Sequence, residues 1–240
     1  MTGGFSGIGA GLLRSLEPDF QPEYIANIDI QTGCDVRNYE DVFKRMEAVI
    51  VPGELNYLVS NAGVVFLRNS NGGSPDFASM PLETLHDMVH INLLGQINVL
   101  HAFINLLRQK NATGNVVAMS SISAFYSGGL NMAVYDATKA AIVALAKDLV
   151  GEKTLRCINV LQPGSIRTNI GGWFSDFTVD SEGLSAVKRG QDEDSERLRS
   201  EVTIDHICSM VRYLFFTDHG MNGSVITIDA GLTLCGREGY

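Results

Sequence analysis

The stretch that decides the fold is Thr2-Gly3-Gly4-Phe5-Ser6-Gly7-Ile8-Gly9, close to the start of the 240-residue chain. Half of its residues are glycines, and a helical pattern follows directly. Glycines in such a turn let backbone N–H groups approach a pyrophosphate at the N-terminus of a helix. The turn therefore indicates a dinucleotide-binding α/β fold, although an ordinary loop at a helix start gives the same pattern.

Short runs of β-branched and aliphatic residues alternate with helical segments along the rest of the chain. This alternation predicts a doubly wound parallel sheet with helices on both faces, and no composition shift divides residues 1–240 into two domains. Helices are expected over 85–107, 133–150 and 204–215. The expected strands cover residues 24–30, 55–60, 115–120, 155–161 and 225–229.

A doubly wound sheet needs a central strand directly before the glycine-rich turn, but only Met1 precedes Thr2. Loss of that strand would leave buried backbone groups of its neighbours unpaired, at about 1–3 kcal/mol each. Several such groups would cancel much of a typical domain stability of about 5–15 kcal/mol. We therefore expect the first strand to be truncated here and the natural protein to begin several residues upstream.

Asp29 ends the strand expected over 24–30, about 20 residues after the turn. A carboxylate at this place accepts the hydroxyls of an adenosine ribose and repels a 2′-phosphate. No Arg or Lys occurs in the turn or just after Asp29, so NAD is favoured over NADP. The alternative is an Asp that only stabilises a turn.

Tyr135 and Lys139 are one helical turn apart within the Ala-rich segment 133–150, so they share a face of the predicted helix. A nearby ammonium group favours the phenolate and lowers the tyrosine pKa from about 10, which makes the phenol an acid or base near neutral pH. The spacing alone is common, and an exposed helical pair is the alternative. The motifs around it favour the catalytic interpretation.

Taken in order, these motifs resemble the short-chain dehydrogenase/reductase family over the whole chain. The matching positions are the turn from Thr2 to Gly9, Asn61-Ala62-Gly63, Asn92, Ser120-Ser121, Tyr135 to Lys139, Pro163-Gly164 with Thr168, and Asp229-Ala230-Gly231. The resemblance implies a Rossmann-like single domain that interconverts a secondary alcohol and a ketone.

The resemblance also implies the roles of four residues. Ser121 would bind the substrate oxygen, and Tyr135 would exchange its proton. Lys139 would bind the nicotinamide ribose and lower the pKa of Tyr135, while Asn92 would hold a water in a proton relay. The residues expected to hold NAD are Gly3, Phe5, Ser6, Gly7, Ile8, Gly9, Asp29, Ile30, Asp35, Val36, Asn61, Ala62, Gly63, Tyr135, Lys139, Pro163, Gly164, Ile166 and Thr168.

Residues 171–202 show no clear period, and an aromatic cluster including Trp173 leads into a polar run. We expect this segment to be a lid over the substrate. Ser123, Phe125 and Trp173 would border a pocket for a largely apolar, cyclic substrate. For the aromatic residues, packing in the core is an equal alternative.

The formal net charge of -9 predicts no nucleic-acid or anionic membrane partner. No apolar run is long enough to cross a bilayer and no signal peptide is evident, so a cytoplasmic location is expected. The four cysteines are scattered without metal-ligand spacing, so no metal is expected. The family resemblance implies a homo-oligomer, either a tetramer or a dimer.

Two other functions are open at this point. One is an NADPH-dependent ketone reductase, and the other is a dinucleotide-binding protein without turnover. The missing first strand favours the second of these, whereas the set of Ser121, Tyr135 and Lys139 argues against it, because a binding module does not need an activated phenol.

Overall fold

The computed structural model describes residues 1–65, 76–127, 131–166 and 202–234. Its strands are all parallel and lie in the order β1-β2-β3-β4. They cover Leu55–Ser60 (β1), Thr113–Met119 (β2), Leu155–Pro163 (β3) and Val225–Ile228 (β4). Four of the predicted strands are thus confirmed, with small shifts at their ends.

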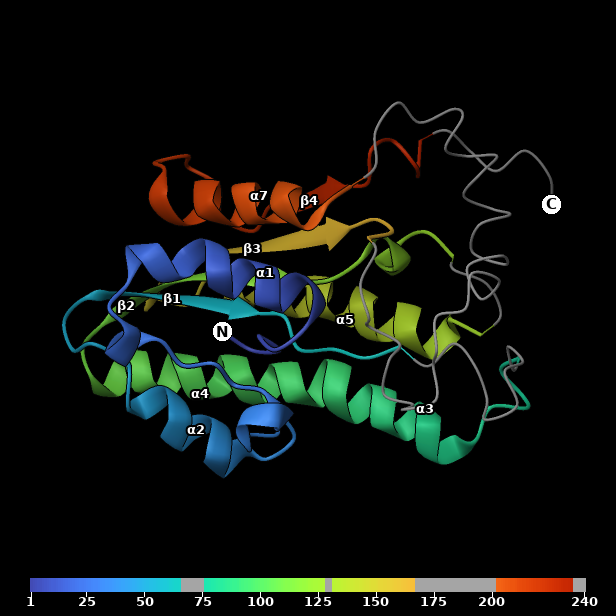
Figure 1. Cartoon of the computed structure of the whole chain (residues 1–240), viewed down its shortest axis with the longest axis horizontal. Coiled ribbons are helices and arrows are strands. Elements are labelled where there is room, and N and C mark those ends of the chain that lie inside the picture. Colours follow the sequence, from blue (N-terminus) through green and yellow to red (C-terminus); the bar gives the residue numbers. More distant parts are fainter. Residues whose placement is uncertain (66–75, 128–130, 167–201, 235–240) are drawn as a thin grey trace.

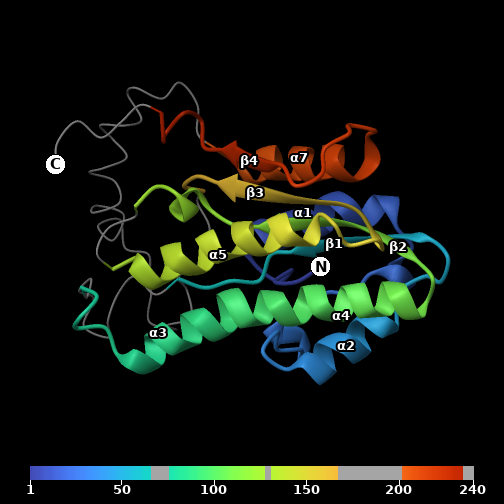
Figure 2. The same ribbon diagram turned by 180° about the vertical axis from the view of Figure 1, so that it is seen from behind.

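Helices cover both faces of this sheet (Figures 1 and 2). The first face carries α1 (Gly7–Leu16) and α7 (Ile204–Phe216). The second carries α2 (Tyr39–Glu47), α4 (Gly95–Gln109) and α5 (Ala133–Leu149). Sequence reasoning missed α2, a short helix that buries only Val42 and Met46. The two-sided arrangement confirms the predicted doubly wound, Rossmann-like fold.

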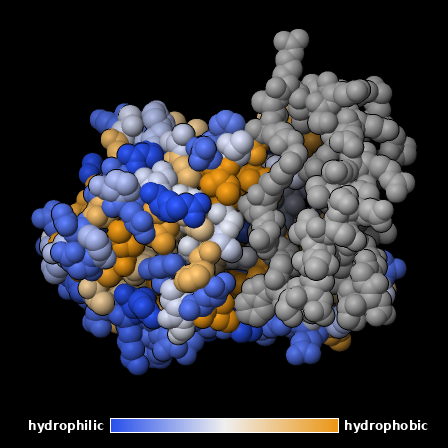
Figure 3. All heavy atoms as spheres, in the orientation of Figure 1, coloured by the Kyte–Doolittle hydropathy of each residue, from blue (hydrophilic) through white to orange (hydrophobic). Residues whose placement is uncertain are grey.

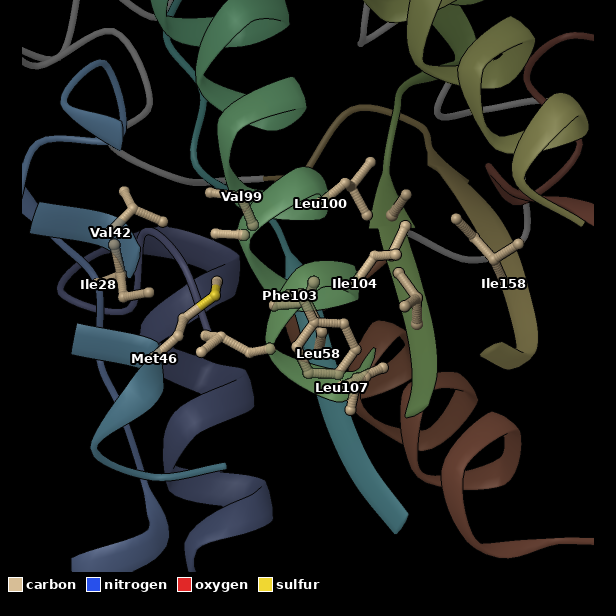
Figure 4. Close-up of a cluster of buried hydrophobic side chains, with 14 of the residues drawn as sticks. Ile28, Val42, Met46, Leu58, Val99, Leu100, Phe103, Ile104, Leu107 and Ile158 are labelled. Carbon is tan, nitrogen blue, oxygen red and sulfur yellow. The ribbon is translucent and has the colours of Figure 1, made fainter. Parts of the chain in front are cut away.

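Neighbouring residues of one strand serve opposite cores, as the alternation of side chains in a strand requires. Leu58 packs with Phe103 and other residues of α4 in the cluster of Figure 4, whereas Val59 packs with Leu12 and Ile207 on the other face. Because strands buried on both faces need apolar side chains throughout, they read as continuous apolar runs in the sequence.

Residues 24–30 do not form the predicted strand. They lie between two 3-10 turns, Pro22–Tyr24 and Ile30–Thr32, and make one isolated parallel bridge, between Ile28 and Thr2. A strand needs a partner along its whole edge, and here backbone pairing is limited to the short segment from Met1 to Gly3. The Ile28 N–H donates to the Met1 carbonyl at 2.8 Å, and the Gly3 N–H donates to the Ile28 carbonyl at 2.9 Å.

The helix predicted over 85–107 is divided into three parts. It comprises α3 (Leu82–Val89), a π-helical turn (His90–Leu94) and α4. Such π-helical turns inside α-helices are frequent at functional sites. The turn contains Asn92, which is fully buried. Of the lid predicted over 171–202, only Val202 belongs to the described residues.

Candidate active site

The glycine-rich turn leads directly into α1, which begins at Gly7. Gly3 and Gly7 adopt left-handed backbone conformations, with φ of 66° and 52°. A Cβ atom on Gly9 would lie 1.8 Å from the Gly3 carbonyl oxygen, so only glycine allows the turn to close. The side chain of Ser6 caps no backbone N–H of α1. The first N–H groups of the helix therefore suit an anionic ligand.

Thr2 holds the segment after β1 against this turn. Its Oγ1 accepts hydrogen bonds from the Asn61 and Ala62 N–H groups, both at 2.9 Å. The Asn61 Nδ2 donates to the Gly3 carbonyl at 3.3 Å. The two predicted cofactor motifs thus form one rigid unit at the carboxyl end of β1.

Asp29 is hydrogen-bonded to the same unit. Its Oδ2 accepts from the Phe5 N–H at 3.0 Å, and its Oδ1 accepts from the Gln31 N–H at 2.9 Å. Asp29 therefore stabilises the turn, which is the alternative that the sequence left open beside ribose binding. Ribose binding is compatible with this role, because a carboxylate offers about four acceptor sites.

A cavity opens between the turn and Asp29. Most of the predicted cofactor residues before Asn92 line it, although Phe5 and Gly9 do not. The predicted residues that do are Gly3, Ser6, Gly7, Ile8, Asp29, Ile30, Asp35, Val36, Asn61, Ala62 and Gly63. Sequence reasoning missed Arg37, which also lines the cavity. The guanidinium group of Arg37 is paired with Asp35 at 2.7 Å and with Asp87 at 3.3 Å.

A second cavity holds the predicted catalytic residues and shares Ile8 and Asn61 with the first. Its lining includes Ser121, Ser123, Tyr135, Lys139, Pro163, Gly164 and Ile166. Phe125 is 57% exposed and lies outside the lining, whereas its neighbour Tyr126 belongs to it. Phe125 is the residue directly after the 3-10 helix Ile122–Ala124, so the predicted role of Phe125 as a pocket wall is not borne out by the described lining. Thr168 and Trp173 lie outside the described residues.

The serines at the end of β2 have different tasks. Ser120 is buried and its Oγ donates to the Lys139 carbonyl at 2.7 Å, so it fixes α5 to the sheet. The Ser121 Oγ accepts from the Ser123 N–H at 3.2 Å and faces the second cavity. The hydroxyls of Ser121 and Ser123 thus both lie in the lining of this cavity, whereas the hydroxyl of Ser120 is engaged with Lys139.

Tyr135 and Lys139 are both buried in α5. The Lys139 Nζ lies 5.6 Å from the centre of the Tyr135 ring and donates to the Met119 carbonyl at 3.1 Å. Burial raises the pKa of Tyr135 to about 12, against the opposing effect of its hydrogen bond with Ser121. This is the reverse of the predicted direction, because loss of solvation outweighs the hydrogen bond with Ser121. Burial also lowers the pKa of Lys139 to about 8.

The Asn92 side chain is hydrogen-bonded to the backbone of Val64, which lines the first cavity. Its Oδ1 accepts from the Val64 N–H at 2.7 Å, and its Nδ2 donates to the Val64 carbonyl at 2.8 Å. A Cβ atom on Gly63 would lie 3.3 Å from the Lys139 Nζ and 3.4 Å from the Asn92 Oδ1. Gly63 thus lies between the two side chains, and the relay through Asn92 stays a prediction.

The described part of the chain also bears on metal binding and on membrane insertion. Its His, Cys, Asp and Glu side chains nowhere gather in a group of three that could hold a metal ion. In the same ranges, every helix is too short or too polar to cross a bilayer.

Comparison with known proteins agrees with this architecture. The family model for short chain dehydrogenases matches residues 24–176. The L-rhamnose-1-dehydrogenase of the yeast Scheffersomyces stipitis is 35% identical over 119 residues, which are 48% of this chain and 43% of that enzyme. The chain therefore matches less than half the length of this relative.

Two other proteins match more of the chain. The L-rhamnose 1-dehydrogenase (NAD(P)(+)) of Azotobacter vinelandii is 27% identical over 85% of this chain and 75% of its own length. The crystal structure of levodione reductase has a TM-score of 0.79 and 20% identity, over 98% of this chain and 96% of that one. Because the identity is low, the structural similarity to levodione reductase shows a shared fold alone. Because the family model covers more than half of the chain, the protein belongs to the short-chain dehydrogenase/reductase family.

Proposed function

We propose that the protein transfers hydride between NAD(H) and a secondary alcohol or ketone. One observation carries this proposal: Ser121, Tyr135 and Lys139 line a cavity that adjoins the cavity of the glycine-rich turn and Asp29. Proton-exchanging groups therefore lie beside a place suited to a dinucleotide.

The residues present fit such a cofactor. The glycine-rich turn and the first N–H groups of α1 suit the pyrophosphate, and Asp29 suits the adenosine ribose. Ile8 and Asn61 connect this end to the cavity of Lys139. When bound, NAD supplies the carbon that accepts a hydride.

The side chains of the second cavity then handle the proton. In the oxidative direction the Tyr135 phenolate takes the proton of the substrate hydroxyl as the hydride leaves, and Ser121 orients the substrate oxygen. Burial raises the pKa of Tyr135 to about 12, so proton transfer near neutral pH requires stabilisation of the phenolate. We propose that Lys139, the cationic side chain in the lining of this cavity, contributes to this stabilisation.

Replacing Tyr135 by Phe tests the proposal. We expect turnover to fall by roughly 10²–10⁴-fold while the Kd for NAD changes far less, because the proton-exchanging group is removed and the other expected cofactor contacts remain. The matched control is Tyr213→Phe, which alters an exposed phenol of α7 that lines neither cavity and should keep turnover. A Tyr135→Phe protein with full activity would instead support a dinucleotide-binding protein without this chemistry.

An NADP(H)-dependent enzyme is the second candidate, and Arg37 favours it. Its guanidinium lines the same cavity as Asp29, and the relative from Azotobacter vinelandii is named for both cofactors. Titration of NAD and NADP into Asp29→Ala and Arg37→Ala variants separates the two. With NAD as the cofactor, Asp29→Ala weakens NAD binding and Arg37→Ala changes little. With NADP as the cofactor, Arg37→Ala costs most of its affinity.

We propose a cyclic alcohol with further ring hydroxyls as substrate. The described wall of the second cavity combines Ser121, Ser123 and Tyr126 with apolar residues such as Met132. This wall has more hydroxyl groups than the largely apolar pocket predicted from the sequence. The L-rhamnose dehydrogenases among the relatives support a sugar-like ring.

We also propose that the protein forms a homo-oligomer through α4 and α5. Leu94, directly before α4, and Ile97, within α4, are apolar residues that are 44% and 38% exposed. They are one helical turn apart, and Figure 2 shows α4 and α5 on the same side of the molecule.

A further inference from the structure

The cavity of the glycine-rich turn contains two opposing signals for the choice of cofactor. Asp29 suits the free hydroxyls of an adenosine ribose, whereas Arg37, in the same lining, suits a 2′-phosphate. The contacts of the Arg37 guanidinium group therefore bear on which signal prevails.

Two carboxylates from different elements hold this guanidinium group. The Arg37 Nε and Nη2 donate to the Asp35 Oδ2 at 2.9 and 2.7 Å, within the loop that carries both residues. The Arg37 Nη1 donates to the Oδ1 of Asp87 at 3.3 Å, and Asp87 belongs to α3. Burial acts to raise the pKa of the Asp35 carboxyl, but the hydrogen bonds from Arg37 hold it below its usual range. Arg37 is thus paired on two sides by charged groups.

The backbone of this loop is fixed, so the side chain of Arg37 is the part that can move. The Asn98 Nδ2 of α4 donates to the Val36 carbonyl at 3.0 Å and to the Arg37 carbonyl at 3.2 Å. The Arg37 side chain, in contrast, is 40% exposed. Its direction therefore depends on the carboxylates that it contacts.

The balance of charge at this end of the cavity is negative. Asp29, Asp35 and Asp87 provide three carboxylates against the one guanidinium group of Arg37. A ribose hydroxyl is uncharged and tolerates this excess, whereas a phosphate monoester brings nearly two more negative charges. A 2′-phosphate would need a guanidinium N–H that is not already given to a carboxylate.

We propose that Asp87 is a specificity-determining residue of the cofactor site, which keeps Arg37 Nη1 from a 2′-phosphate and thereby favours NAD over NADP. Asp87 lies outside the described lining of the cavity and acts through Arg37, so it is a positioning residue. Without Asp87, Asp35 still supports Nε and Nη2, and Nη1 becomes available as a donor. The inference rests on the proposed transfer of hydride with NAD(H) and assigns the choice of cofactor to a side chain on α3.

The exposure of the ion pair sets the size of the effect. Arg37 and Asp87 are 40% and 41% exposed, so water and salt screen their attraction. We expect Asp87→Asn to tighten NADP binding roughly tenfold, because it releases Nη1 and removes one repelling charge. The Kd for NAD should change by less than about twofold, because ribose hydroxyls gain nothing from a freed cation.

Calorimetric titration of NAD and NADP into the wild-type chain and five variants tests the proposal. Asp87→Asn, Arg37→Ala and their double variant form a cycle, in which the gain in NADP affinity should vanish without Arg37. Asp87→Glu keeps the charge and should keep the wild-type ratio of the two Kd values. Glu83→Gln is the matched control, because it removes one negative charge from an exposed position of the same helix. The gain in Asp87→Asn should also shrink as salt rises from about 0.05 M to about 0.5 M.

Unchanged NADP affinity in Asp87→Asn, with NAD binding intact, would overturn the proposal and leave the proposed function standing. An equal gain in Glu83→Gln would do the same, because net charge would then explain it, and so would a gain that persists without Arg37. A wild-type chain that binds NADP more tightly than NAD would also overturn it. A folded chain that binds neither dinucleotide would contradict the proposed function itself, and this inference with it.

Discussion

At the scale of single residues, the site contains ionisable side chains that are buried, so their charged forms lose solvation by water and their pKa values shift. Burial lowers the pKa of Lys139 to about 8 from 10.5 and raises that of Tyr135 to about 12. The sequence predicts which residues lie together, because YxxxK spacing fixes one helix face. It does not predict these pKa values, because burial depends on the packing of α5 against β2 and β3.

The buried amine of Lys139 gives a prediction about stability. Between pH 8 and 10.5 the unfolded chain binds more protons at this residue than the folded chain, so stability rises with pH in this window. We expect Lys139→Met to flatten this rise and to abolish turnover, as measured by thermal melts over a pH series and by activity. Lys147→Met, at an exposed position of the same helix, is the control. An unchanged slope in Lys139→Met would contradict the prediction.

The serines at the end of β2 give a second prediction. Ser121→Ala should lower activity by roughly 10²-fold with little change in Tm, because it removes a group that stabilises developing charge. Ser120→Ala should instead lower the free energy of unfolding by about 1 kcal/mol, through loss of its hydrogen bond to Lys139. Denaturant titration and activity of both variants check the pair. If Ser120→Ala lost activity and Ser121→Ala lost only stability, the catalytic serine would be Ser120 and the prediction would be wrong.

At the scale of elements, the glycine-rich turn, α1 and four strands follow from sequence patterns. The failure at residues 24–30 has a physical reason: a strand is stabilised by its neighbours, and backbone pairing of this one is limited to the short segment from Met1 to Gly3. The π-helical turn at Asn92 and the position of Arg37 in the cofactor cavity depend equally on tertiary contacts. No local pattern around these residues indicates them.

Closure of the glycine-rich turn gives the prediction at this scale. Gly9→Ala places a Cβ atom against the Gly3 carbonyl, so the turn has to open and the N–H groups of α1 lose their alignment. We expect the affinity for NAD to fall at least tenfold and the Tm to drop. Gly151→Ala is the matched control, because no atom lies within 4 Å of its Cβ position. Calorimetric titration with NAD distinguishes the two, and equal affinities would contradict the account of the turn.

At the scale of the whole molecule, the described surface is mixed in character, and Figure 3 shows hydrophobic residues between hydrophilic ones on the face that it displays. If α4 forms the contact between subunits, replacing both Leu94 and Ile97 by Asp should reduce the mass measured by light scattering. The control is Tyr213→Asp on α7, which covers the other face of the sheet. A mass unaffected by the double substitution would exclude this surface as the contact.

Hydride transfer itself is tested most directly by isotope labelling. Cyclic secondary alcohols and pyranose sugars, each deuterated at the carbon that bears the reacting hydroxyl, are incubated with the protein and NAD. Mass spectrometry then shows whether deuterium reaches the reduced cofactor. The proposed function predicts label in NADH with the wild-type chain and its loss with Tyr135→Phe. A folded, NAD-binding chain that transfers no label from any of these alcohols would contradict it.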